Sequence, residues 1–310
     1  FLYEIRNNDF RHRRLDMSGL KEWLMEDVGG SKKQNSQPDG RRNRSFDPDS
    51  RAHKICVNTA YAAISIIMLV ATWYVVSWYV NKTVIPTPLE TWDALVDFFE
   101  NGDSTAGGSA WSYIRSSFGT LLKGFLIALV LAFPIGLLLG SVPVLDRLFS
   151  PALNVLRPIA PVAWAPVLII LLQSDASGAM MVVFIGAFFP ILTTVSFGVK
   201  KIDANLINAT KVLGATWSQT YVKITVPASV PFLMNGVKTA LGIGWMCIVS
   251  AELYASGVGG LGNYITNQAG LGAWPQVYAG IVIVGILGLI TVLVADYVSK
   301  VLNKKWGVEE

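Results

Sequence analysis

Long apolar runs alternate with polar connections along most of this chain. Runs of about 20 residues are the length that crosses a bilayer core of about 30 Å as a helix. None of them alternates as a strand does, and the short alternating segments of a membrane barrel are missing. The pattern predicts an all-α membrane protein with six transmembrane helices, at about 57–80, 117–141, 154–173, 178–199, 231–254 and 277–301.

The first 54 residues are polar and rich in charges of both signs. A short amphipathic helix over about 17–28, or a weakly helical tail, is compatible with four apolar residues at helical spacing, Leu20, Trp23, Leu24 and Val28. The first apolar run begins near residue 58, too late for a secretory signal, and a chain that starts at Phe1 is expected to be a processed product. We predict a cytoplasmic extension, 1–54, and a transmembrane domain, 55–310.

Basic residues are concentrated on alternate connections between the apolar runs, which sets the orientation by the positive-inside rule. The connections predicted to be cytoplasmic carry Arg41, Arg42, Arg44, Arg51, Lys54, Arg147, Arg157, Lys200, Lys201, Lys211, Lys223, Lys300, Lys304 and Lys305. The opposite connections carry mainly acids, together with Lys82 and Arg115. Both termini are therefore predicted to be cytoplasmic. In the first outer connection an interfacial helix is predicted from Leu89, Trp92, Val96 and Phe99.

The composition indicates that the chain lies in lipid, because 52% of the residues are hydrophobic and only 15% are charged. The net charge is +4, but the basic residues flank apolar runs, which favours membrane topology over nucleic-acid binding. Two cysteines, Cys56 and Cys247, and two histidines, His12 and His53, have no metal-binding or disulfide pattern. We expect no catalytic residues, no metal and no cofactor.

The connection at about 200–230 is much longer than a passive link between two helices needs to be. Asp203 is a good N-cap for a first short helix, which Gly214 can end in the left-handed conformation. Thr216 or Ser218 can cap a second short helix. The pattern predicts a compact pair of helices below the membrane that exposes small and apolar residues, which suits docking into a groove on another protein.

The same connection resembles the EAA loop of binding-protein-dependent ABC transporter permeases. Asn208-Ala209-Thr210, three residues, Gly214, nine residues, Ile224, one residue and Val226-Pro227 reproduce every gap of the family pattern Glu-Ala-Ala, three, Gly, nine, Ile, one, Leu-Pro. Two identities differ, because Asn208 stands where the family has Glu and Thr210 where it has the second Ala. Any salt bridge of that Glu is therefore not expected in this chain.

Further stretches resemble the nitrate/sulfonate/bicarbonate/taurine-type branch of this family, over about residues 56–303. They are residues 85–89 (Ile-Pro-Thr-Pro-Leu), 133–140, 156–166 (Leu-Arg-Pro-Ile-Ala-Pro-Val-Ala-Trp-Ala-Pro), 250–253 (Ser-Ala-Glu-Leu) and 259–262 (Gly-Gly-Leu-Gly). The resemblance implies the type I ABC importer permease fold, with a cytoplasmic coupling helix, in the inner (plasma) membrane of a prokaryotic cell.

The resemblance also implies partners, since the chain has no phosphate-binding loop of the Gly-x-x-x-x-Gly-Lys-Ser/Thr type. They are separate ABC ATPase subunits, a second permease subunit in an expected homodimer, and an extracytoplasmic substrate-binding protein, with lipid around them. The residues expected to dock the ATPase are Asn208, Ala209, Thr210, Gly214, Ala215, Trp217, Ile224 and Pro227. The expected solute is a small anion such as nitrate, bicarbonate, taurine, another sulfonate or an aromatic acid.

The residues that line the translocation path or gate are expected to be Pro158, Pro161, Trp164, Gly244, Trp245, Ser250 and Glu252. For the prolines the alternative is a kinked packing helix, and for Gly242 and Gly244 it is close helix packing. Glu252 is compatible with a brace of the outer gate or with a partner such as Arg115 or a backbone group. Arg157 either attracts an anion or anchors its helix at the headgroups.

Two other classes of protein remain as alternatives. A self-contained channel or ion-driven carrier would need paired charges inside the membrane, and only Glu252 and Asp296 are counted as such groups. A membrane enzyme is disfavoured, because both histidines lie outside the transmembrane portion and no Ser/His/Asp set is found.

Overall fold

The computed structural model describes residues 51–80, 84–103, 107–255 and 259–305, and the regular elements within these ranges are helices. The amphipathic helix expected over 17–28 lies outside these residues. Contacts between residues divide the chain into two units after Ala62, and the arrangement below concerns the unit that begins at Ala63.

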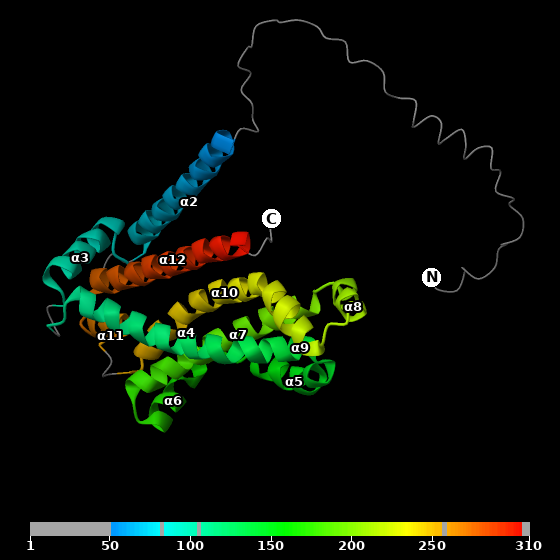
Figure 1. Cartoon of the computed structure of the whole chain (residues 1–310). Coiled ribbons are helices and arrows are strands. Elements are labelled where there is room, and N and C mark those ends of the chain that lie inside the picture. The colour runs from blue at the N-terminus through cyan, green and yellow to red at the C-terminus, as the bar shows by residue number, and fades with distance from the viewer. Residues whose placement is uncertain (1–50, 81–83, 104–106, 256–258, 306–310) are drawn as a thin grey trace, which may run out of the picture. The chain divides into compact units, whose positions relative to one another are not determined.

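The elements follow one another as Figure 1 labels them. In chain order they are α2 (Arg51–Tyr79), α3 (Pro88–Asn101), α4 (Ala110–Ser141), α5 (Pro143–Leu156), the 3-10 turn η1 (Pro161–Trp164), α6 (Ala165–Leu172), α7 (Asp175–Lys200), α8 (Ala204–Val212), α9 (Trp217–Thr220), the π-helical turn η2 (Tyr221–Thr225), α10 (Val226–Glu252), α11 (Leu261–Gly270) and α12 (Trp274–Lys305).

Five helices in the described ranges are long and apolar enough to cross a membrane. They contain the predicted second, fourth and sixth spans and overlap the predicted first and fifth, which run slightly past the ends of their helices. The predicted third span, 154–173, falls on a bent pair, because the helical segments Pro143–Leu156 and Pro161–Leu172 meet at 79°. Pro158 and Pro161 lie at this bend, and each lacks the N–H that would continue the helical hydrogen bonds.

Small residues bring α4, α7 and α10 together in the centre of the bundle. A Cβ atom added to Gly124 of α4 would lie 2.5 Å from the Met180 carbonyl oxygen of α7, and one added to Gly140 would clash with Val199. Gly186 of α7 lies against Cys247 of α10 in the same way. Such close approach replaces the hydrophobic effect as the source of packing energy between membrane helices.

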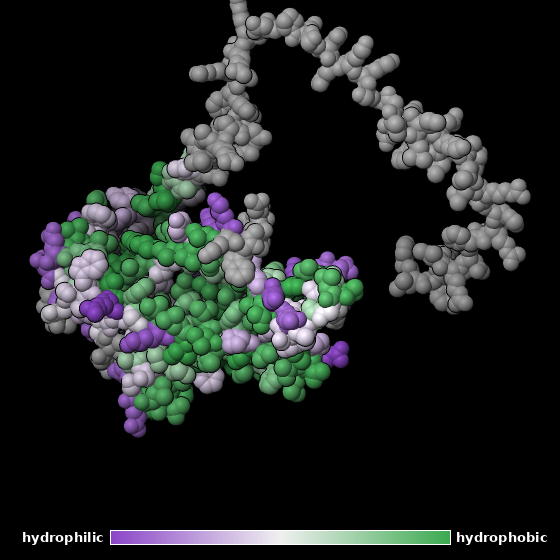
Figure 2. All heavy atoms as spheres, in the orientation of Figure 1, coloured by the Kyte–Doolittle hydropathy of each residue, from purple (hydrophilic) through white to green (hydrophobic). Residues whose placement is uncertain are grey.

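The two ends of the bundle differ from its middle. We call the end that carries α8 and α9 the inner end, and the end that carries α3 and α11 the outer end (Figure 1). Figure 2 shows hydrophobic residues over most of the middle and hydrophilic residues mainly toward the two ends. In the connection where an interfacial helix is expected, the structure has the helix α3. It begins with a capping box between Thr87 and Glu90 and exposes its apolar stripe.

Candidate functional site

At the inner end, the connection between α7 and α10 folds into the two expected short helices. The Asp203 side chain accepts a hydrogen bond from the Asn205 N–H at 2.8 Å, at the start of α8. Gly214 ends this segment with φ +77°, a conformation that costs a residue with a Cβ about 1–2 kcal/mol. The predicted cap and the predicted left-handed glycine are therefore both confirmed.

The second short helix continues directly into a membrane helix. Thr216 caps α9 through a reciprocal pair of hydrogen bonds with Gln219, so Thr216 rather than Ser218 is the cap. After α9 the turn η2 leads into α10, and the chain stays helical for 36 residues from Trp217 to Glu252. The hydroxyl oxygens of Thr210 and Thr220 lie 3.2 Å apart and join α8 to α9. No loop therefore separates α9 from α10.

The surface of this helix pair exposes several large apolar side chains. Val212 and Leu213 are 87% and 84% exposed, and Trp217 stacks on Tyr221 with ring centroids 5.0 Å apart. A pocket of about 280 Å³ between the two helices is lined by four of the eight predicted docking residues, Thr210, Gly214, Ala215 and Ile224. Exposed apolar side chains around a small pocket are typical of a surface that binds another protein. We call residues 203–225 the inner knob.

Asn208 and Ala209 lie on the exposed surface of α8, whereas Pro227 lies in the first turn of α10 and is partly buried. Asn208 is the position at which the family pattern has Glu. Its exposure places it where a partner protein can contact it directly.

One face of α10 is exposed along the length of the helix and is partly polar. It carries the exposed residues Asn235, Thr239 and Met246 and the partly exposed Ser250, spaced by one or two turns. Met246 is 71% exposed, while Gly244 and Trp245 are buried against neighbouring helices. The hydroxyls of Thr239 and Ser250 donate to the carbonyl oxygens four residues earlier, at 3.0 and 2.7 Å, so the Asn235 amide is the polar group of this face that favours contact with water or protein. We call these four residues the α10 stripe.

The predicted path residues separate into an exposed set and a buried set. Ser250 belongs to the α10 stripe, Pro158 and Trp164 are exposed, and Pro161 is partly exposed. Ala165, which follows Trp164, is fully buried in the same apolar cluster as Cys247 and Ile248, so η1 and α6 lie beside the outer half of α10. Gly244, Trp245 and Glu252 form the buried set and lie inside the subunit.

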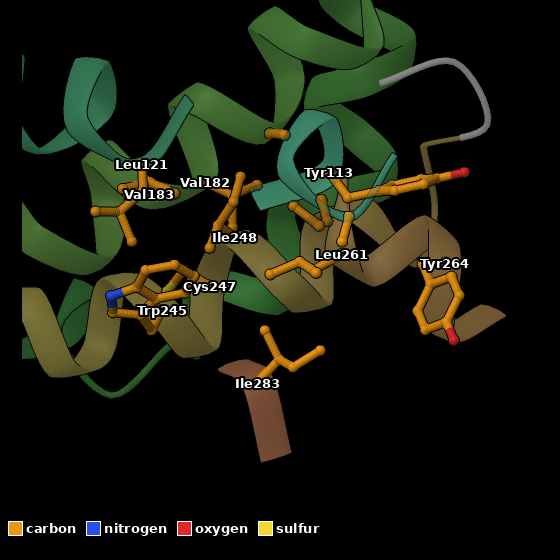
Figure 3. Close-up of a cluster of buried hydrophobic side chains, with 14 of the residues drawn as sticks. Tyr113, Leu121, Val182, Val183, Trp245, Cys247, Ile248, Leu261, Tyr264 and Ile283 are labelled. Atoms are coloured by element: carbon orange, nitrogen blue, oxygen red, sulfur yellow. The ribbon is translucent and has the colours of Figure 1, made fainter. Parts of the chain in front are cut away.

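Figure 3 shows the apolar cluster behind the outer half of α10, where Trp245, Cys247 and Ile248 meet residues of α4, α7 and α12. The Trp245 indole N–H donates to the Thr291 hydroxyl at 2.9 Å, so α10 is joined to α12 as well as packed on it. A Cβ atom on Gly244 would meet Leu121 and Val183 only at ordinary contact distances of 3.6 Å or more, and one on Gly242 would meet nothing within 4 Å, so the close packing expected for these glycines is not found in the subunit.

At the outer end, the fully buried Glu252 joins three helices. Its carboxylate accepts hydrogen bonds from the Ser117 hydroxyl of α4, at 2.8 and 2.9 Å, and from the Gly262 N–H of α11, at 2.8 Å. The Leu261 N–H donates in turn to the Ser117 hydroxyl oxygen at 2.9 Å. The partners of Glu252 are thus a hydroxyl and a backbone group rather than Arg115. The first N–H groups of α11 favour a negative charge at this place.

A second buried carboxylate, Asp103, holds the other end of α11. It accepts hydrogen bonds from the Tyr113 hydroxyl of α4 at 2.8 Å and from the Gln268 amide of α11 at 3.1 Å. Tyr113 and Tyr264 contribute rings to the same cluster, 5.8 Å apart between centroids (Figure 3). We call Glu252, Asp103 and their partners the outer lock, since they fix α11 to α4 and α10.

Sequence reasoning missed a charged group inside the membrane portion. Lys238 of α10 donates to Asp296 of α12 at 2.5 Å, and Lys300 donates to the other oxygen of Asp296 at 2.9 Å. Lys238 was overlooked because a single basic residue hardly lowers the mean hydropathy of a 24-residue run. The signal was nevertheless present, because a lysine within an apolar span needs a partner or water.

Comparison with known families gives one match that covers more than half of the chain. Residues 128–308 match the family described as "Binding-protein-dependent transport system inner membrane component". This segment contains the inner knob, the α10 stripe and the residues from α4 onward that pack against them.

Several named proteins are similar to this chain over most of their length. The "Nitrate import permease protein NrtB" of Leptolyngbya laminosa is 30% identical over 76% of this chain and 85% of its own. A "Putative ABC transporter permease protein" of Methanocaldococcus jannaschii is 34% identical over 72% and 83%. The "Bicarbonate transport system permease protein CmpB" of Synechocystis sp. is 28% identical over 70% and 80%.

Among solved structures, a chain from an inward-facing crystal form of the MetNI methionine ABC transporter resembles this fold. The TM-score is 0.50 and the identity 22%, and the match covers 62% of this chain and 93% of that one. At this identity the similarity concerns the fold alone.

Proposed function

Because this chain belongs to the family of inner membrane components of binding-protein-dependent transport systems, we propose that it is the permease subunit of an ATP-driven importer for a small anion. The observation that carries the proposal is the inner knob, a rigid pair of short helices with an exposed apolar surface, joined without a loop to α10. The expected ABC ATPase subunits are the partners that would bind this surface.

In this proposal the ATPase subunit binds the inner knob and moves it when nucleotide binds and is hydrolysed. The exposed side chains of Leu213 and Trp217 would be buried in the ATPase cleft, and each buried side chain of this size contributes about 1.5–3 kcal/mol. Because α9, η2 and α10 form one helical segment, the motion would reach the α10 stripe directly. The solute path would then open alternately to the two sides of the membrane.

A path for the solute is expected where two copies of the permease meet. One subunit exposes the α10 stripe on its surface, and a second copy would close a polar channel over it. Pro158, Pro161 and Trp164 flank the outer half of this face and are the proposed gate residues, with Ser250. Glu252 would hold the outer end of α10 while the gate moves.

The proposed solute is a small anion delivered by an extracytoplasmic substrate-binding protein. Two named relatives transport nitrate and bicarbonate according to their descriptions, and the branch resemblance also includes taurine and other sulfonates. The orientation with both termini in the cytoplasm would place the inner knob on the side where ATP is available.

The docking role can be tested with two glycines in equivalent backbone conformations. Gly214 in the inner knob has φ +77° and Gly272 at the outer end has φ +73°, and a Cβ atom on either one would meet nothing within 4 Å. The strain of a substitution is therefore the same at both sites. We expect Gly214→Trp to abolish copurification of the ATPase subunit and ATP-dependent uptake, while Gly272→Trp retains the ATPase.

The proposal is wrong if Gly214→Trp binds the ATPase and transports normally. A separate experiment addresses the ion-driven carrier, whose charge requirement the pair Lys238–Asp296 would meet. Liposomes that contain only this chain should take up no solute along an ion gradient, and uptake there would favour the carrier instead.

A further inference from the structure

The outer half of α4 exposes two basic residues on one side of the helix. Arg115 and Lys123 are both exposed and stand eight positions apart, so they lie about two turns from each other. Gly119 lies midway between them, and a Cβ atom there would meet nothing within 4 Å. Neither basic side chain forms an ion pair or a hydrogen bond with another residue that the structure describes. Both are therefore available to a partner outside the subunit.

An uncharged stretch of α4 begins directly after Lys123. It runs from Gly124 to Ser141, the last residue of the helix, and at 1.5 Å per residue it is about 27 Å long. The hydrocarbon core of a bilayer is about 30 Å thick. If Ser141 marks the inner edge of the core, Lys123 lies close to the outer edge.

The neighbouring helix α7 supports this depth. Two glycines of α4 lie against valines of α7 with the same offset along the chain, Gly124 against Val183 and Gly140 against Val199. The two helices therefore run parallel, and Asp175, the first residue of α7, is level with the residue next to Arg115. Arg115 thus lies where α7 begins with a charge, and Lys123 lies about 12 Å deeper.

The Lys123 ammonium group comes close to the layer in which Arg115 lies. Side chains on a helix point toward its N-terminus, which for α4 is at the outer end. A lysine near the edge of the hydrocarbon core extends its charge to the headgroups in this way. The two cations can therefore reach one headgroup layer.

This side of α4 is turned away from the α10 stripe. Leu121 is the neighbour of Gly244 in α10, and Lys123 follows Leu121 by two positions, which is about 200° around the helix. The exposed residues that follow Lys123 are apolar, as Leu126 and Ile127 show. An apolar face with cations at its outer edge is suited to lipid rather than to an aqueous solute path.

From this arrangement we infer that Arg115 and Lys123 bind the phosphate group of an anionic phospholipid in the leaflet at the outer end. Its acyl chains lie along Leu126 and Ile127. Charge complementarity decides the choice of lipid, because two cations without a described counter-charge favour a headgroup with net negative charge. The inference goes beyond the transport function and requires only that α4 spans the membrane.

The rest of the outer end does not favour anions. The helix α3 exposes four acids there, Glu90, Asp93, Asp97 and Glu100. A preference for an anionic lipid at this end would therefore come from the two cations of α4 and not from the surface as a whole. The competing explanations are that the two cations contact any headgroup alike, or that they contact a second copy of the permease.

The test is native mass spectrometry of the permease–ATPase complex in detergent, titrated with phosphatidylglycerol or with phosphatidylethanolamine. The first dissociation constant for each lipid is measured, and the ratio of the two gives the preference. A basic residue near an anionic headgroup contributes about fivefold in affinity. We expect Arg115→Gln and Lys123→Gln each to lower the preference for phosphatidylglycerol about fivefold, and Lys123→Arg to keep it.

The matched control is Arg147→Gln, which removes an exposed basic residue from the inner end and should leave the preference unchanged. Three results would overturn the inference. They are equal affinity of the parent complex for the two lipids, an equal fall of the preference in Arg147→Gln and Lys123→Gln, and loss of the second permease subunit in Lys123→Gln. The ATPase should stay bound through the inner knob in every variant, so the docking proposal is judged separately.

Discussion

The inner knob and the outer lock are built on opposite principles. At the outer end, the polar groups of Glu252 and Asp103 are buried, and they bond to serine, tyrosine, glutamine and backbone partners of the same chain. At the inner end, large apolar side chains such as Leu213 and Trp217 are left in the open. The outer end satisfies its polar groups within the chain, whereas the inner end exposes the apolar side chains that we propose bind the ATPase subunit.

This difference distinguishes the end of the bundle that is held together by its own bonds from the end on which we propose the ATPase subunit acts. A buried, fully bonded carboxylate network ties α4, α10 and α11 into one body, because separating the helices would leave charged and polar groups without partners. The inner knob is attached through short helices and a pair of threonine hydroxyls. Force applied at the inner end would thus move α10 against a fixed outer attachment.

The largest effect is expected from breaking the outer lock. Glu252→Ala removes the acceptor of the Ser117 hydroxyl and the Gly262 N–H, and two buried donors without partners cost about 2–6 kcal/mol. For a chain of this size that lowers the unfolding temperature in detergent by roughly 3–9 °C. Differential scanning fluorimetry of the purified permease measures this shift.

The control for this prediction is Glu252→Gln, which keeps the shape and one acceptor oxygen and should lower the unfolding temperature by less than half as much. Equal unfolding temperatures for Glu252→Ala and the parent protein would show that the network does not stabilise the outer end. Loss of transport without loss of stability would instead assign Glu252 to the path.

Sequence alone predicted the inner knob more completely than the outer lock, for a physical reason. Capping residues, a left-handed glycine and prolines act over a few positions, so Asp203, Gly214 and Thr216 could be identified from local spacing. The outer lock joins residues more than a hundred positions apart, as in the bond between Ser117 and Glu252. Such pairs have no local signature, so Glu252 was recognised as unusual and a backbone partner was considered, while Ser117 was not identified.

The third span shows a further limit of sequence reasoning. Hydropathy indicated one apolar segment at 154–173, and the prolines indicated an interruption. The angle of 79° between the helices on either side of residues 157–160 depends on packing against α7 and α10, which hydropathy does not report. Lys238 escaped notice for a related reason, since its significance depends on Asp296 in another helix.

An intermediate effect is expected from a polar substitution on the inner knob. Leu213→Asp places a charge where an apolar side chain would be buried in the ATPase. Since burial of a leucine contributes about 1.5–3 kcal/mol, the affinity should fall about tenfold to a hundredfold. Binding of the purified ATPase subunit to the permease in nanodiscs, followed by light interferometry, measures the dissociation constant.

The matched control is Leu271→Asp at the outer end, where a leucine is also well exposed. Neither variant should change the unfolding temperature, because neither side chain is buried in the subunit. If both variants bound the ATPase equally well, Leu213 would not belong to the docking surface. If both lost binding, the effect would come from charge on the complex as a whole.

The smallest effect is expected from capping boxes, which the two ends share. Thr216 and Gln219 start α9 at the inner end, and Thr87 and Glu90 start α3 at the outer end by the same pair of reciprocal bonds. Replacement of either threonine by alanine removes one cap, which costs about 1 kcal/mol. Because α9 is a single turn, that loss should fray the helix that transmits motion to α10.

Thr216→Ala should therefore lower solute transported per ATP hydrolysed by a few-fold in proteoliposomes, while the ATPase remains bound through Leu213 and Trp217. Thr87→Ala should leave this ratio unchanged, since α3 lies at the far end from the inner knob. Equal ratios for the two variants would mean that motion reaches α10 by another route, for example through α7. A lower ratio of solute transported to ATP hydrolysed in Thr216→Ala than in Thr87→Ala would show that the four residues of α9 transmit motion to α10.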